Sequence, residues 1–85
     1  MSKFIKFYAD WCGPCKTLSS MIGSLPESAN LDIQSVNIDT EIDLAAKYSV
    51  RGLPTVVMLD DQGLEVRRLT KSPQSVHELR EFMGI

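Results

Sequence analysis

Trp11-Cys12-Gly13-Pro14-Cys15-Lys16 holds the only two cysteines of this chain, with two residues between them. The apolar run Phe4–Tyr8 comes just before this hexapeptide, and apolar residues at helical spacing follow it. A Cys-X-X-Cys pair between a strand and a helix is typical of a redox dithiol at a helix N-terminus. The hexapeptide therefore predicts thiol chemistry at the start of a helix.

Apolar patterns on either side of the hexapeptide predict four strands and three helices. Continuous or alternating apolar runs indicate strands at residues 4–8, 31–38, 55–59 and 64–69. Helical spacing predicts a helix beginning near Cys12, a short helix through about residue 48, and a last helix near the C-terminus. We expect a loop over 23–30, where Pro26 interrupts the pattern. Capping-box patterns at 40–43 and 75–78 indicate helix starts, and Ser72-Pro73 is a competing start for the last helix.

The predicted element order is β-α-β-α-β-β-α within one domain of 85 residues, 1–85. The helix between the first two strands makes them parallel, and the last two strands form an antiparallel hairpin. A net charge of −2 argues against a nucleic-acid partner, and no segment has the roughly 20 apolar residues that cross a bilayer. No secretory signal is recognisable at the N-terminus, so we expect a reducing cytoplasm.

Three motifs in this order resemble the thioredoxin family over nearly the whole chain. They are the Cys-Gly-Pro-Cys segment 7–16, the strand-to-helix junction Val36-Asn37-Ile38-Asp39, and the loop Tyr48-Ser49-Val50-Arg51-Gly52-Leu53-Pro54-Thr55. The resemblance implies an α/β class and a minimal thioredoxin fold. This fold has a four-stranded mixed sheet in the order 2-1-3-4, with one helix on one face and two on the other.

The cysteine pair predicts dithiol–disulfide exchange that reduces protein disulfides. A thiolate is the attacking group, and cysteines in such motifs titrate between about 3.5 and 7.5. Cys12, at the helix start, is the expected nucleophile, and Cys15, one turn inward, is the expected resolving thiol. Gly-Pro between the cysteines is typical of reducing thioredoxins. The resemblance implies regeneration by a thioredoxin reductase or by glutathione. A glutaredoxin-like protein reduced by glutathione and a non-catalytic binding module are the alternatives.

The residues around the cysteines indicate how a protein substrate is held. Gly13 lets a target backbone come close, and Pro14 makes the turn rigid. The resemblance implies a cis Leu53–Pro54 bond beside the dithiol, and an apolar rim of Trp11, Leu53 and Pro54. Trp11 as a core aromatic residue and Pro54 as an ordinary turn proline are the alternatives. We expect a monomer.

A zinc site and a purely structural disulfide are the competing interpretations of the cysteines. Zinc normally takes four ligands. The chain offers two cysteines and a single histidine, His77, which lies about sixty residues further on. We therefore expect no metal and no bound cofactor, only a redox-active Cys12–Cys15 disulfide.

Lys6 departs from the family pattern. Thioredoxins carry a buried aspartate at this place in the first strand, and a nearby lysine where this chain has Ser35. Strand interiors of parallel sheets rarely hold an unpaired lysine. One hypothesis places Lys6 near Cys15, where its charge favours the thiolate. The alternative is that its ammonium extends to the surface and leaves the thiols unaffected.

Overall fold

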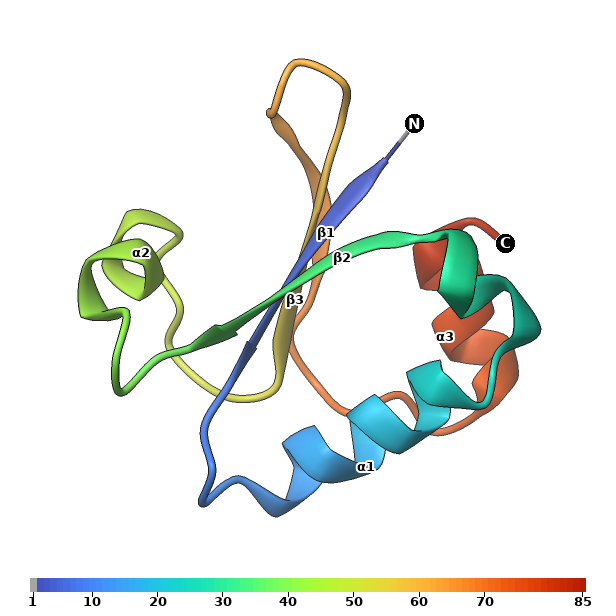
Figure 1. Ribbon diagram of the computed structural model, residues 1–85, viewed down its shortest axis with the longest axis horizontal. Coiled ribbons are helices and arrows are strands. Elements are labelled where there is room, and N and C mark those ends of the chain that lie inside the picture. Colours follow the sequence, from blue (N-terminus) through green and yellow to red (C-terminus); the bar gives the residue numbers. More distant parts are fainter. Residues whose placement is uncertain (1) are drawn as a thin grey trace.

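A four-stranded sheet with helices on both faces forms the molecule (Figure 1). The computed structural model describes residues 2–85. The strands are β1 (Lys3–Tyr8), β2 (Asp32–Asn37), β3 (Thr55–Leu59) and β4 (Glu65–Leu69). The helices are α1 (Gly13–Gly23), the 3₁₀-helix η1 (Pro26–Asn30), α2 (Ile42–Lys47) and α3 (Val76–Met83). The sheet order β2-β1-β3-β4 and the three α-helices confirm the predicted fold class.

The pairing of the two central strands positions the site. β1 pairs in parallel with β2 and antiparallel with β3, and β4 pairs antiparallel with β3. In this register Phe7, near the end of β1, lies opposite Thr55, the first residue of β3. The chain that leaves β1 toward the cysteines and the loop that enters β3 therefore meet at one end of the sheet.

Two hydrophobic cores cover the two faces of the sheet. Alternation along β1 sends Phe4 into the core shared with α1 and α3, and Ile5 into the core shared with α2. Figure 1 shows α2 on one side of the sheet and α1 and α3 on the other. This confirms the predicted split of one helix and two.

Two local predictions near helix starts were wrong. Residues 26–30, expected in a loop, form the 3₁₀-helix η1, because Ser28 N donates to Leu25 O at 3.0 Å and closes a tight turn. The capping box at 40–43 does not form, because Thr40 Oγ1 donates back to Asn37 O at 3.3 Å instead. The other capping prediction is confirmed: Ser75 caps α3 by accepting from Glu78 N at 3.1 Å.

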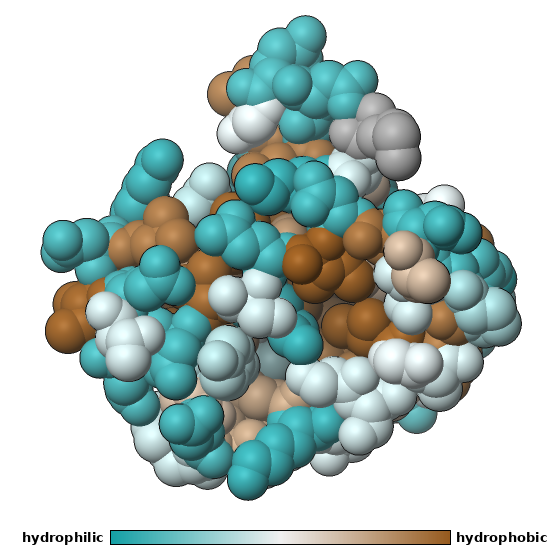
Figure 2. All heavy atoms as spheres, in the orientation of Figure 1, coloured by the Kyte–Doolittle hydropathy of each residue, from teal (hydrophilic) through white to brown (hydrophobic). Residues whose placement is uncertain are grey.

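At the end of the sheet opposite the cysteines, the surface consists mainly of polar side chains. Figure 2 shows hydrophilic atoms over the projecting turn between β3 and β4, which contains Asp60, Asp61 and Gln62. Within residues 2–85, no helix combines the length and apolar character needed to cross a membrane.

Candidate active site

Both cysteines lie at the start of α1. Cys12 is the N-cap residue, and Gly13 and Pro14 form the first helical positions. Proline is favoured there because its missing N–H would have no partner within the helix. Cys15 N donates to Cys12 Sγ at 3.1 Å, so the sulfur takes the place that a capping oxygen usually fills. A thiolate on Cys12 would be stabilised by the same N–H group and by the helix dipole.

The two cysteines form a disulfide, with their Cα atoms 5.3 Å apart. They pack with Ala9 in a small buried cluster, covered by Ile38 and Leu53 among others. Cys12 N also donates to Ala9 O at 3.1 Å, which fixes the turn between β1 and α1. The sulfur atoms are therefore held in a rigid, largely apolar setting at the end of the sheet.

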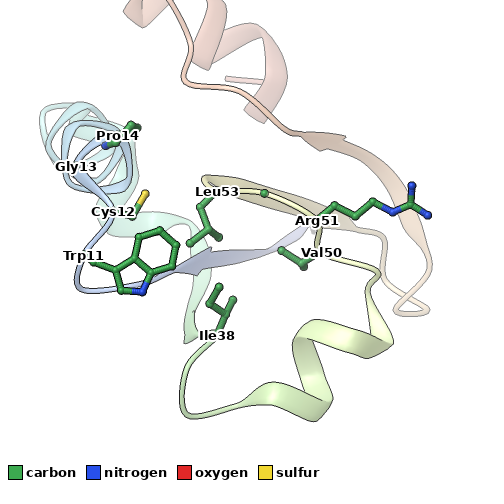
Figure 3. Close-up of a pocket in the computed structure, with 9 residues that line it drawn as sticks. Trp11, Cys12, Gly13, Pro14, Ile38, Val50, Arg51 and Leu53 are labelled. Carbon is green, nitrogen blue, oxygen red and sulfur yellow. The ribbon is translucent and has the colours of Figure 1, made fainter.

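Cys12 and Cys15 face different spaces. Cys12 lines a cavity of about 390 Å³ together with residues from three separate segments of chain. Figure 3 shows Trp11, Ile38, Val50 and Leu53 gathered around this cavity, whereas the Arg51 side chain extends away from it. Cys15 lines another cavity, of about 290 Å³, beside Asp10. A protein that docks over the first cavity would meet Cys12.

Trp11 is on the surface, so the alternative of a core aromatic residue was wrong. Its side chain is 69% exposed, and Nε1 donates to Asp39 Oδ2 at 2.9 Å. This bond joins the cysteine loop to the end of β2, 28 residues further along the chain. The indole is thereby fixed beside Cys12 while its ring stays open to a partner.

The loop before β3 provides the wall opposite the cysteines. The Leu53–Pro54 bond is cis, as the family resemblance implies. Thr55 Oγ1 donates to Gly52 O at 2.7 Å and ties the loop to the start of β3. Leu53 lines the cavity with Gly52, but Pro54 is buried and does not line it. The predicted apolar rim therefore consists of Trp11 and Leu53, with Pro54 beneath it.

Lys6 reaches the helix that carries the cysteines. Its Nζ donates to Ser19 Oγ at 2.7 Å, and partial burial lowers the pKa of Lys6 from its usual value. Ser19 lies four residues after Cys15 on α1, and both line the 290 Å³ cavity. In the strand register, Lys6 lies beside Ser35, the other position that departs from the family pattern. The effect of this charge on the thiols stays a prediction.

Sequence reasoning gave no site role to four residues that line the Cys12 cavity. Ile38 follows β2, and Val50, Arg51 and Gly52 precede the cis-proline. All four lie in motifs that carry the family resemblance, and that was the signal that could have identified them. The groups that could hold a metal are missing: no cluster of three His, Cys, Asp or Glu side chains suited to a metal ion occurs in residues 2–85.

The site thus combines an α/β fold with a Cys-X-X-Cys disulfide at the N-terminus of a helix, an arrangement typical of thiol redox proteins. The family profile described as thioredoxin matches residues 2–84. The chain belongs to the thioredoxin family.

Curated proteins and solved structures agree with this family. The thioredoxin of Chlamydia trachomatis is 42% identical over 65 residues, which are 75% of this chain and 63% of that protein. Thioredoxin 1 of Chlorobaculum tepidum is 39% identical over 57 residues, 65% of this chain and 56% of that protein. The thioredoxin of Fasciola hepatica superposes with a TM-score of 0.84 at 33% identity, covering 98% of this chain and 78% of that one. The chain thus spans less than two thirds of the two curated relatives.

Proposed function

We propose that this protein is a thiol–disulfide oxidoreductase that reduces disulfides of other proteins. The observation that carries the proposal is the position of Cys12, which caps α1 and lines the cavity beside the cis-proline loop. A nucleophile in this position is both activated by the helix N-terminus and open to a docked target. Membership of the thioredoxin family supports the same activity.

The proposed reaction has two exchange steps. The Cys12 thiolate attacks one sulfur of the target disulfide, forms a mixed disulfide and releases the other target sulfur as a thiolate. Cys15 then loses its proton and attacks Cys12 Sγ, which releases the second target thiolate and forms the Cys12–Cys15 disulfide. Two electrons pass from the dithiol to the target, and the two protons of the dithiol end on the target thiols.

Five residues around the dithiol are proposed to bind the target. Trp11 and Leu53 offer apolar surface on either side of the Cys12 cavity, and Gly13 leaves space there for a target backbone. Pro14 stiffens the helix start. Pro54 is buried, so its part in binding is to shape the loop that presents Leu53 to the target.

The electron source, the place of action and the oligomeric state are part of the proposal. The curated relatives above carry the name thioredoxin, which favours a flavoprotein reductase over glutathione. A reducing compartment such as the cytoplasm suits a dithiol that must be regenerated after each turn. We expect a monomer, because an open cavity at Cys12 is required for docking.

An insulin-disulfide reduction assay with each electron source tests the proposal. We expect turnover with dithiothreitol and with thioredoxin reductase plus NADPH, and little with glutathione. Cys12→Ser should abolish turnover. Cys15→Ser should accumulate a mixed disulfide with insulin, because the second step is blocked. No turnover with any reductant would overturn the proposal. A binding module would then be the remaining alternative, and its partner binding should survive replacement of both cysteines by serine.

A further inference from the structure

A second cavity adjoins the one at Cys12. It has a volume of about 360 Å³, and all but one of its lining residues carry a polar or charged side chain. Its lining residues are Ser49, Arg51, Gly52, Thr55, Arg68 and Thr70. Arg51 and Gly52 line both cavities, so the two cavities adjoin at the loop before β3.

Arg51 gives the second cavity its unpaired positive charge, and Arg68 adds a guanidinium that is already paired with Glu65. Arg51 is exposed, and within residues 2–85 no carboxylate forms an ion pair with it. Arg68 pairs with Glu65 through Nε at 2.6 Å and Nη2 at 2.7 Å, which leaves Nη1 outside that pair. Arginine presents five N–H donors in a fork that matches a carboxylate. In Figure 3 the Arg51 side chain extends away from the Cys12 cavity, which agrees with its place in the lining of the second cavity.

A negative charge lies beside Trp11, which is on the other side of the Cys12 cavity from Arg51 (Figure 3). The Asp39 carboxylate there accepts the hydrogen bond from Trp11 Nε1. A target segment that crosses from Trp11 to Arg51 therefore passes from a negative to a positive end. Such a gradient selects both the charge pattern and the direction of the bound segment.

We infer that the second cavity is a subsite for an acidic side chain of the target protein, and that Arg51 determines this specificity. This inference rests on the proposed function. Because the second cavity adjoins the one at Cys12, and an extended segment advances about 3.3 Å per residue, the acidic side chain should lie a few residues from the target cysteine. The uncharged hydroxyl groups of Ser49 and Thr70 add donors without competing charge.

Single-turnover reduction of small peptide disulfides tests the inference. Each peptide carries one cysteine and one variable residue, either Glu, Gln or Lys, placed at one of four positions on either side of the cysteine. Pre-reduced protein is mixed with each peptide, and the released thiol is quantified by chromatography. We expect Glu to react about three- to fivefold faster than Lys at positions on one side of the cysteine only, the scale of a solvent-exposed charge pair. Salt at high concentration should reduce this ratio.

Variants separate the role of Arg51 from general charge effects. Arg51→Gln should bring the Glu-to-Lys ratio close to one, whereas Lys3→Gln, which removes the same charge from the start of β1, should keep it. An equal rate for Glu and Lys peptides in the wild type would overturn the inference, as would a ratio that Arg51→Gln leaves unchanged. A clear preference for oxidised glutathione over every peptide would also overturn it. Failure of the proposed function would look different, because no peptide would then be reduced.

Discussion

Lys6 is a charged residue in the interior of a central strand, with Ile5 and Phe7 as its apolar neighbours. Its Nζ reaches Ser19 on α1, and Ser19 shares a cavity with Cys15. Side chains on a helix lean toward the N-terminus, so the Ser19 hydroxyl lies over the turn that begins at Cys15. This hydrogen bond is the observation that supports an effect of the Lys6 charge on the resolving thiol.

Lys6→Met tests whether this charge acts on the thiols. We expect the fraction of Cys15 present as thiolate at neutral pH to fall by roughly two- to threefold, the scale of a partly screened charge interaction. Nuclear magnetic resonance of the cysteine Cβ atoms, followed over pH in reduced protein, measures it. Lys3→Met is the matched control, because it removes a charge from the opposite face of the same strand. Identical titration curves for Lys6→Met and wild type would support the alternative, in which the Lys6 ammonium extends to solvent and leaves the thiols unaffected.

At the scale of elements, a salt bridge joins η1 to α3. Arg80 on α3 donates to Glu27 on η1 through both terminal nitrogens, with Nη1 at 3.0 Å from Oε1. These hydrogen bonds hold the pKa of the Glu27 carboxyl below its usual value. The bridge spans 53 residues of chain and ties together two helical elements on the same face of the sheet.

The Glu27–Arg80 bridge makes stability depend on pH in the acid range. Because the pKa of Glu27 is lower in the folded state, the stabilisation is fully present above the unfolded value, about 4.3, and is lost as the pH falls through the folded value. Arg80→Gln should lower Tm at pH 7 by about 1–4 °C, and the difference from wild type should vanish in acid. Thermal melts from pH 7 downward measure it, with Lys71→Gln as a control for loss of positive charge. A difference that persists at the lowest pH would contradict an electrostatic origin.

Sequence patterns predict the elements better than the contacts between them. The start of α1 follows from Cys12 and Pro14, and the strand Thr55–Leu59 follows from an unbroken apolar run. The 3₁₀-helix η1 escapes such reasoning because its bonds are short-range and leave no periodic pattern. The bond between Trp11 and Asp39 and the shared lining by Ile38 and Val50 depend on the sheet register, which no local pattern contains.

At the scale of the whole molecule, the two cores lie back to back on the same strands of the sheet. On β3, Val56 belongs to the core under α1 and α3, and its neighbour Val57 belongs to the core under α2. Both side chains are essentially inaccessible, at 1% and 0%. A chain of this size has little stability to spare, so we expect neither core to persist without the other.

Val56→Ala and Val57→Ala test whether the chain unfolds as one unit. Each removes buried methyl groups and should lower the free energy of unfolding by about 1–3 kcal/mol. In urea unfolding, a single domain requires an unchanged m value and one transition in every variant. Val66→Ala on β4, where the side chain is 51% exposed, should change stability by no more than about 0.5 kcal/mol. A reduced m value or a second transition in Val57→Ala alone would mean that the α2 side unfolds separately from the side that carries the cysteines.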